Sequence, residues 1–181
     1  MYYMFTKVDN KIITRKIRNE SISFLERIHG DICGPIHPPC GLFIYFMILI
    51  DASIRWSYIC LSSTRNQVFA KLLVQLRVHL LNYLIKKICF DNTSEITSHA
   101  FHKYCISIVI EVEHLVAHVH AQNRPAKSLL KCLELVAISL LMIANIPMAT
   151  WGYAILHVAL LIRIKPTSYH KYSIMQLVFG Q

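Results

Sequence analysis

The chain has 181 residues, the length of a single domain with a buried core. Nineteen lysines and arginines outnumber ten aspartates and glutamates, so the formal net charge is +9 at pH 7. A balance this basic favours a polyanionic partner, either nucleic acid or an anionic membrane surface. The first twenty residues carry scattered charges from Lys7 onward and no apolar segment, so we expect them not to be a signal peptide. We therefore expect an intracellular protein, not a secreted one, whose six cysteines are reduced.

The 55% hydrophobic content requires a membrane alternative to be weighed. Residues 135–162 contain no aspartate, glutamate, lysine or arginine, and this stretch exceeds the roughly 20 residues that a membrane span needs. However, Asn145 and Pro147 interrupt it, and its apolar residues recur every three or four positions. This pattern favours two packed helices and no membrane. The alternative is a small basic membrane-associated protein anchored by residues 135–162.

The predicted elements alternate between strands and helices along the chain. Residues 1–24 are predicted to be a basic tail, residues 25–164 one domain, and residues 165–181 a second tail. Apolar and β-branched runs predict five strands: 26–33, 42–51, 55–61, 84–91 and 106–113. Helical spacing predicts helices at 63–84 and 92–104 and two more between 127 and 162. The resulting order, β-β-β-α-β-α-β-α-α, predicts an α/β fold with a mixed five-stranded sheet flanked by helices.

Two aspartates end predicted strands and are followed by turn residues. Asp31 lies near the end of the first predicted strand, and Asp91 is the last residue of the fourth. If those strands are adjacent and parallel, the two carboxylates lie side by side and repel each other unless a cation lies between them. Oxygen ligands alone favour Mg²⁺ or Mn²⁺ over zinc. The alternative reading is that each aspartate only caps a turn.

Five short segments, taken in order, resemble the blocks of the copia-type retrotransposon integrase core, a retroviral-integrase-like part of a Pol polyprotein. They are "HGDICGPI", "YFMILIDASIRW", "DNTSEITS", "AHVHAQNRPA" and "TWGYAILHVA". The resemblance covers about residues 28–181. Each motif alone would be weak evidence, and the ordered set is specific.

The resemblance implies a ribonuclease-H-like fold with an Asp–Asp–Glu triad that joins retroelement DNA ends to target DNA. It assigns the first two carboxylates to Asp31 and Asp91, with Mg²⁺ or Mn²⁺ as cofactor and the nucleus as the location. It also implies DNA contacts by residues in and directly after the third and fourth of these segments: Asn92, Gln122, Asn123, Arg124, Lys127 and Lys131. Self-association is left open.

The third carboxylate of the triad is missing from its expected position. Members of the family separate their second and third carboxylates by thirty-five residues, and counting from Asp91 leads to Lys127. An ammonium there removes a ligand and repels the metal ions. Lys127 could instead form an ion pair with both aspartates. Glu134 lies two turns further along the same predicted helix, about 10 Å away and too far to ligate with Asp31 and Asp91. The resemblance therefore implies a degenerate, inactive copy.

The other metal-like pattern in the chain does not fit zinc. His29, Cys33, His37 and Cys40 are spaced by four, four and three positions through a proline-rich loop. Structural zinc sites need two ligand pairs separated by a longer arm. We therefore predict that these side chains do not hold zinc.

Overall fold

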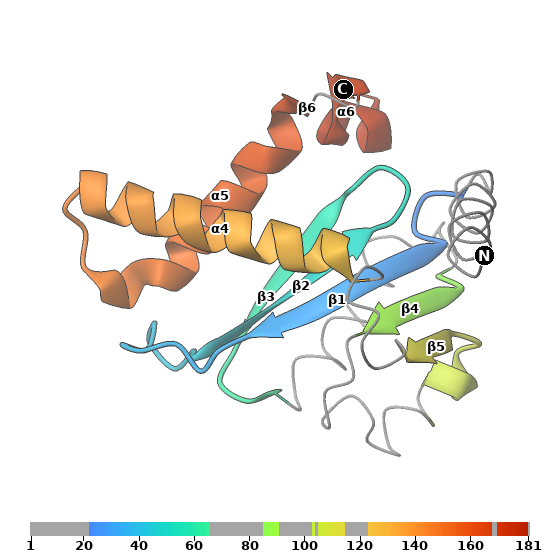
Figure 1. Cartoon of the computed structure of the whole chain (residues 1–181), viewed down its shortest axis with the longest axis horizontal. Coiled ribbons are helices and arrows are strands. Elements are labelled where there is room, and N and C mark those ends of the chain that lie inside the picture. Colours follow the sequence, from blue (N-terminus) through green and yellow to red (C-terminus); the bar gives the residue numbers. More distant parts are fainter. Residues whose placement is uncertain are drawn as a thin grey trace, which may run out of the picture.

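The computed structural model describes residues 22–65, 85–90, 103, 105–114, 123–167 and 170–180. These residues form a five-stranded sheet with two long helices on one of its faces, and a small hairpin and a short helix follow (Figure 1). The sheet strands are β1 (Arg27–Cys33), β2 (Tyr45–Asp51), β3 (Ser57–Ser62), β4 (Lys87–Phe90) and β5 (Glu111–His114). The later elements are α4 (Arg124–Ile143), η1 (Met148–Thr150), α5 (Trp151–Ile164), β6 (Pro166–Thr167), β7 (His170–Ser173) and α6 (Ile174–Phe179).

The strand order is β3-β2-β1-β4-β5. The first three strands pair antiparallel, and β4 and β5 run parallel to β1. The predicted mixed five-stranded sheet is therefore confirmed. Its first and fourth strands are parallel neighbours, which is the condition under which Asp31 and Asp91 are expected to lie side by side. The predicted helices at 63–84 and 92–104 fall almost entirely outside the described residues.

Strand β2, which lies between β3 and β1, is buried on both faces. Phe46, Ile48 and Ile50 pack with α4 and α5 on one face, whereas Met47 and Leu49 belong to the core on the opposite face. This alternation follows from the two-residue period of a strand. It explains why residues 46–51 read as an uninterrupted apolar run that ends in a buried aspartate.

Helix α4 packs on the sheet through residues spaced seven, four and four positions apart. Ala126, Leu133, Ala137 and Leu141 are its buried residues, as the 3.6-residue period requires for one helix face. The helix ends where Asn145 takes a positive φ of 52° and the Ile146 amide donates to the Leu141 carbonyl at 2.9 Å. The predicted interruption of residues 135–162 is thus confirmed. No helix in the described ranges is long and apolar enough to cross a membrane.

The predicted start of the fifth strand is wrong. Residues 106–113 were expected to be extended because they are rich in isoleucine and valine. Instead, Cys105–Ser107 is helical, and this helix ends at Val109, which has a φ of 59°. The Ile110 amide donates back to the Cys105 carbonyl at 2.9 Å, so β5 begins only at Glu111. Local hydrogen bonding and packing override β propensity here.

The last described residues pack against the beginning of β3. The Phe179 ring contacts Trp56 edge-on, with 5.5 Å between ring centroids. The Arg163 guanidinium lies 4.8 Å from the Trp56 ring centroid and donates from Nη2 to the Ser57 carbonyl at 2.6 Å. These contacts join the end of α5 and α6 to the sheet. The predicted domain bounds remain a prediction.

Candidate functional site

Asp31 lies on β1 and faces the helical layer. It pairs with Ile48, and the strand period places it on the same face as Cys33. Both Ile48 and Cys33 belong to the core beneath α4 and α5. Asp31 is partly buried, and its Oδ1 accepts a hydrogen bond from the Ile32 amide at 3.0 Å. The predicted first carboxylate is therefore on the side of the sheet where α4 lies.

Asp91 lies outside the described residues, and so do Asn92 and Gln122. The structure describes β4 as far as Phe90, which pairs with Gly30 in the parallel register. In the sequence, Asp31 directly follows Gly30 and Asp91 directly follows Phe90. A Cβ atom at position 30 would clash with the ring of Phe90, so the packing of this ring over Gly30 requires glycine there.

The first turn of α4 is attached directly to β1. Asn123, the residue before the helix, is only 1% exposed, and its Nδ2 donates to the Gly30 carbonyl at 3.1 Å. Its own carbonyl accepts from the Lys127 amide at 3.1 Å. Lys127 is partly buried, whereas Arg124 and Lys131 are exposed. One residue therefore links the strand position just before Asp31 to Lys127.

Glu134 is engaged with the end of β1. The Cys33 thiol donates to its Oε1 at 2.8 Å. Burial, the hydrogen bond to Glu134 and the negative charges of Glu134 and Asp31 raise the pKa of the Cys33 thiol to about 12. Cys33 is thus a protonated donor at neutral pH, and Glu134 is occupied by a contact that the sequence did not predict.

Two further acidic residues have structural partners. Asp51 is 1% exposed and accepts from the amides of Leu25, Ser53 and Ile54 and from the Ser53 hydroxyl. It fixes the turn between β2 and β3.

The second of these acidic residues, Glu113 on β5, pairs with Arg27 and accepts from the Cys89 thiol at 2.9 Å. Burial alone would raise the pKa of Glu113, but hydrogen bonds from Cys89 and Arg27 hold it below its ordinary value. Glu113 therefore joins three neighbouring strands, β1, β4 and β5.

His29, two residues before Asp31, is 9% exposed. Burial, followed by the positive charges of Arg27 and Arg55, lowers its pKa to about 4. Its Nδ1 is buried, and none of the described residues forms a hydrogen bond to it. His29 is therefore a neutral histidine of the core at neutral pH.

The described residues do not by themselves form a site for divalent metal ions. Among them, no group of three or more histidine, cysteine, aspartate or glutamate side chains is placed to hold one. At the predicted position they offer one carboxylate, Asp31, while Asp91 lies outside the described residues. Mg²⁺ needs several oxygen ligands around it, so Asp31 alone does not form such a site.

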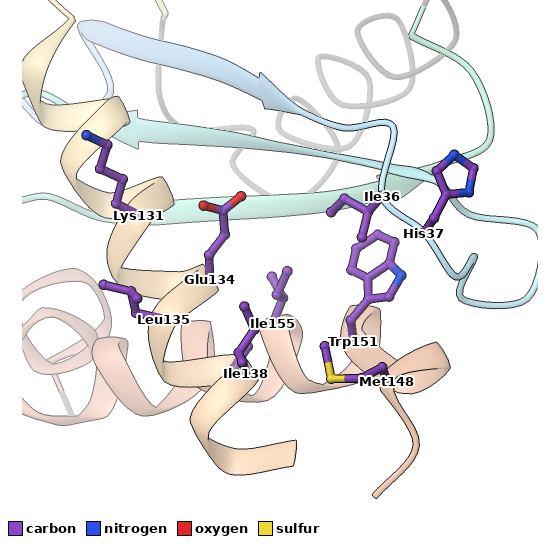
Figure 2. A pocket seen from close by; sticks show the side chains of 10 residues that line it. Ile36, His37, Lys131, Glu134, Leu135, Ile138, Met148, Trp151 and Ile155 are labelled. Atoms are coloured by element: carbon purple, nitrogen blue, oxygen red, sulfur yellow. The ribbon is translucent and has the colours of Figure 1, made fainter. Parts of the chain in front are cut away.

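A cavity of about 500 Å³ adjoins the Cys33–Glu134 contact (Figure 2). It lies between the loop after β1, the side of α4 and the start of α5, and apolar side chains dominate its lining. Figure 2 shows the Glu134 carboxylate directed toward the strands, while Lys131 extends away from Ile138. The polar lining residues are His37, Lys131 and Glu134.

The attachment of Asn123 to Gly30 could not be read from the sequence. Pro125 in the first turn is a usual signal for a helix start, so the beginning of α4 was accessible. The partner of the Asn123 side chain lies 93 positions away in the chain. No local pattern indicates a contact over that separation.

Comparisons with known proteins agree with the fold and the motifs. The chain is 27% identical over 172 residues to the retrovirus-related Pol polyprotein from transposon TNT 1-94 of Nicotiana tabacum. This alignment covers 92% of the chain and 13% of the polyprotein. No family model matches the chain.

A solved structure also matches, a chain from the cryo-EM structure of the simian T-cell lymphotropic virus intasome in complex with PP2A regulatory subunit B56 gamma. The TM-score is 0.69 at 13% identity, and the match covers 88% of this chain and 56% of that one. Together the comparisons confirm the predicted resemblance to an integrase-like core and the ribonuclease-H-like fold.

Proposed function

We propose that the chain is a degenerate integrase catalytic core of a copia-type retrotransposon Pol polyprotein, which binds DNA but does not join it. The observation that supports this proposal is the attachment of the first turn of α4 to β1 through Asn123, because this turn carries Lys127 and the strand carries Asp31. The resemblance expects a glutamate at position 127. The proposed domain comprises residues 25–164.

The proposed loss of activity follows from charge. In active members of this class, divalent ions held by three carboxylates activate the attacking hydroxyl and stabilise the leaving oxygen. Asp31 and Asp91 are the residues of this chain that would hold such ions. An ammonium in the third position repels them and supplies no ligand. We propose instead that the Lys127 ammonium neutralises Asp31 and Asp91.

The proposed DNA contact is made by the basic residues in the first two turns of α4. Arg124 and Lys131 are exposed on the helix that begins over β1, and Lys127 lies between them in sequence. Three cations on two helical turns suit sequence-independent contacts with phosphates. The burial of Asn123 argues against a direct DNA contact by that side chain in this arrangement. Contacts by Asn92 and Gln122, and a nuclear location, rest on the resemblance alone.

A strand-transfer assay tests the proposed inactivity. The unmodified chain, incubated with retroelement-end and target duplexes in Mn²⁺, is expected to yield no joined product. Its binding to the same duplexes should persist and should weaken as salt increases. Robust joining by the unmodified chain would refute the broken triad, and salt-independent or absent binding would refute the DNA contact.

A further inference from the structure

The Asn123 side chain occupies an unusual place for a residue at the head of a helix. Residues that precede helices commonly use their side chain to accept a hydrogen bond from an amide of the first turn. Asn123 makes no such bond. Its side chain instead reaches across to the neighbouring strand and donates to the Gly30 carbonyl, and only 1% of the residue is exposed.

The orientation of this amide group is fixed by its partner. A carbonyl oxygen can only accept, so the group that faces Gly30 must be the NH₂ of Asn123. The Oδ1 atom therefore points the other way, and no donor among the described residues reaches it. Leaving a buried acceptor unsatisfied costs free energy. The residue is thus held by its donor function and not by its acceptor function.

The backbone of Asn123 completes a short path between the two site positions. Its carbonyl accepts from the Lys127 amide at 3.1 Å, while its side chain holds the peptide group that joins Gly30 to Asp31. One side-chain bond and one helical bond therefore set how position 127 lies relative to position 31.

We infer that Asn123 is a positioning residue that fixes position 127, the third position of the site, over β1. We call its two hydrogen bonds, to the Gly30 carbonyl and from the Lys127 amide, the clamp. This inference rests on the proposed function, because only that function makes position 127 part of a site. It predicts that position 127 still lies in its place relative to position 31, although the third carboxylate has been replaced by lysine. The clamp also accounts for the burial of Asn123, a polar residue of the segment "AHVHAQNRPA". Its effect on the site is through position 127 and not through contact with DNA.

Amide hydrogen exchange on the full chain tests the clamp without any metal. Asn123→Ala should speed exchange of the Lys127 amide roughly tenfold, because a buried hydrogen bond is lost. Asn123→Asp separates the clamp from helix capping. Aspartate is an equally good capping residue and favours the helix dipole, but it places an oxygen against the Gly30 carbonyl. The clamp therefore predicts faster exchange in both variants, whereas a capping role predicts no loss with aspartate.

Trp151→Phe is the matched control. Trp151 also begins a helix and donates from Nε1 to a distant carbonyl, that of Pro38, at 3.0 Å. Its substitution should leave exchange of the Lys127 amide, measured relative to amides of β2, unchanged within about twofold. Unchanged Lys127 exchange in both Asn123 variants would overturn the inference.

A second measurement links the clamp to the site. In a Lys127→Glu background, adding Asn123→Ala should weaken Mn²⁺ binding roughly tenfold by calorimetry, and adding Trp151→Phe should not. If Asn123→Ala leaves Mn²⁺ affinity unchanged, the positioning role is wrong. If Lys127→Glu binds no Mn²⁺ at all, the proposal that this site descends from a metal site is wrong. The hydrogen-exchange experiment alone then decides whether the clamp exists.

Discussion

The Cys33 thiol donates to Glu134 Oε1 at 2.8 Å, which ties the last residue of β1 to the middle of α4. Together with the bond between Asn123 and Gly30, it attaches the helix to the strand at two points. Asp31 lies between Gly30 and Cys33 in the sequence. The relative position of α4 and Asp31 is therefore set by hydrogen bonds as well as by apolar packing.

The Cys33 thiol should be unreactive in the folded protein. With its pKa raised to about 12, it has roughly a thousandfold less thiolate at pH 8 than an ordinary thiol. Alkylation with iodoacetamide followed by mass spectrometry should label the exposed Cys132 long before Cys33. Glu134→Ala should speed labelling of Cys33, and denatured protein should show no difference between the two sites. Equal labelling of both in the native chain would contradict the contact.

The buried His29 makes stability depend on pH. Its pKa is lowered to about 4, so between that value and its ordinary value of 6.5 the unfolded chain binds a proton that the folded chain does not. Stability then falls as the pH falls, by about 2 kcal/mol between pH 7 and pH 5. Urea unfolding at both pH values measures this, and His29→Gln should remove most of the difference. The pKa of Glu113 is also lowered, but from 4.5, below this pH range. An equal loss in the variant would show that His29 is not the cause.

The Asp51 carboxylate should be among the most stabilising single groups. It satisfies three amides and one hydroxyl in a buried turn, so Asp51→Ala should cost about 3–5 kcal/mol of unfolding free energy. Ser53→Ala removes only the hydroxyl bond and should cost about 1 kcal/mol. Urea denaturation distinguishes them. A cost below about 1 kcal/mol for Asp51→Ala would contradict the role of this carboxylate.

The sequence predicted the sheet well because its strands carry strong local signals. The buried strand before Asp51 and the mixed five-stranded sheet followed from pattern and order, whereas the parallel pairing of β1 with β4 was only a condition of the site hypothesis. The predicted start of the fifth strand is wrong because Val109 takes a positive φ. A β-branched residue rarely adopts this conformation, and no propensity scale anticipates it.

The candidate site was only partly accessible from the sequence. Spacing within the motifs located Asp31 and Lys127, whose elements the structure brings together. The contact of Glu134 with Cys33 depends on how α4 crosses β1. The distance from position 127 to Glu134 along the helix does not predict that crossing. The roles of Asp91, Asn92 and Gln122 remain predictions, since these residues lie outside the described part.

DNA affinity should depend on the exposed cations of α4. The double variant Arg124→Gln/Lys131→Gln removes two charges and should lower the slope of log affinity against log salt by about 2. Fluorescence anisotropy with a labelled duplex measures this between roughly 50 and 200 mM salt. Lys165→Gln, at an exposed lysine after α5, is the control and should change little. An unchanged slope in the double variant would place the DNA contact elsewhere.

The most direct test of the missing carboxylate is a Mn²⁺ titration of Lys127→Glu by calorimetry. We predict that the unmodified chain shows no measurable binding, that Lys127→Glu gains it, and that adding Asp31→Asn to this variant abolishes it. The account would be contradicted if the unmodified chain bound Mn²⁺ as tightly as the variant. It would equally be contradicted if a folded Lys127→Glu protein bound none.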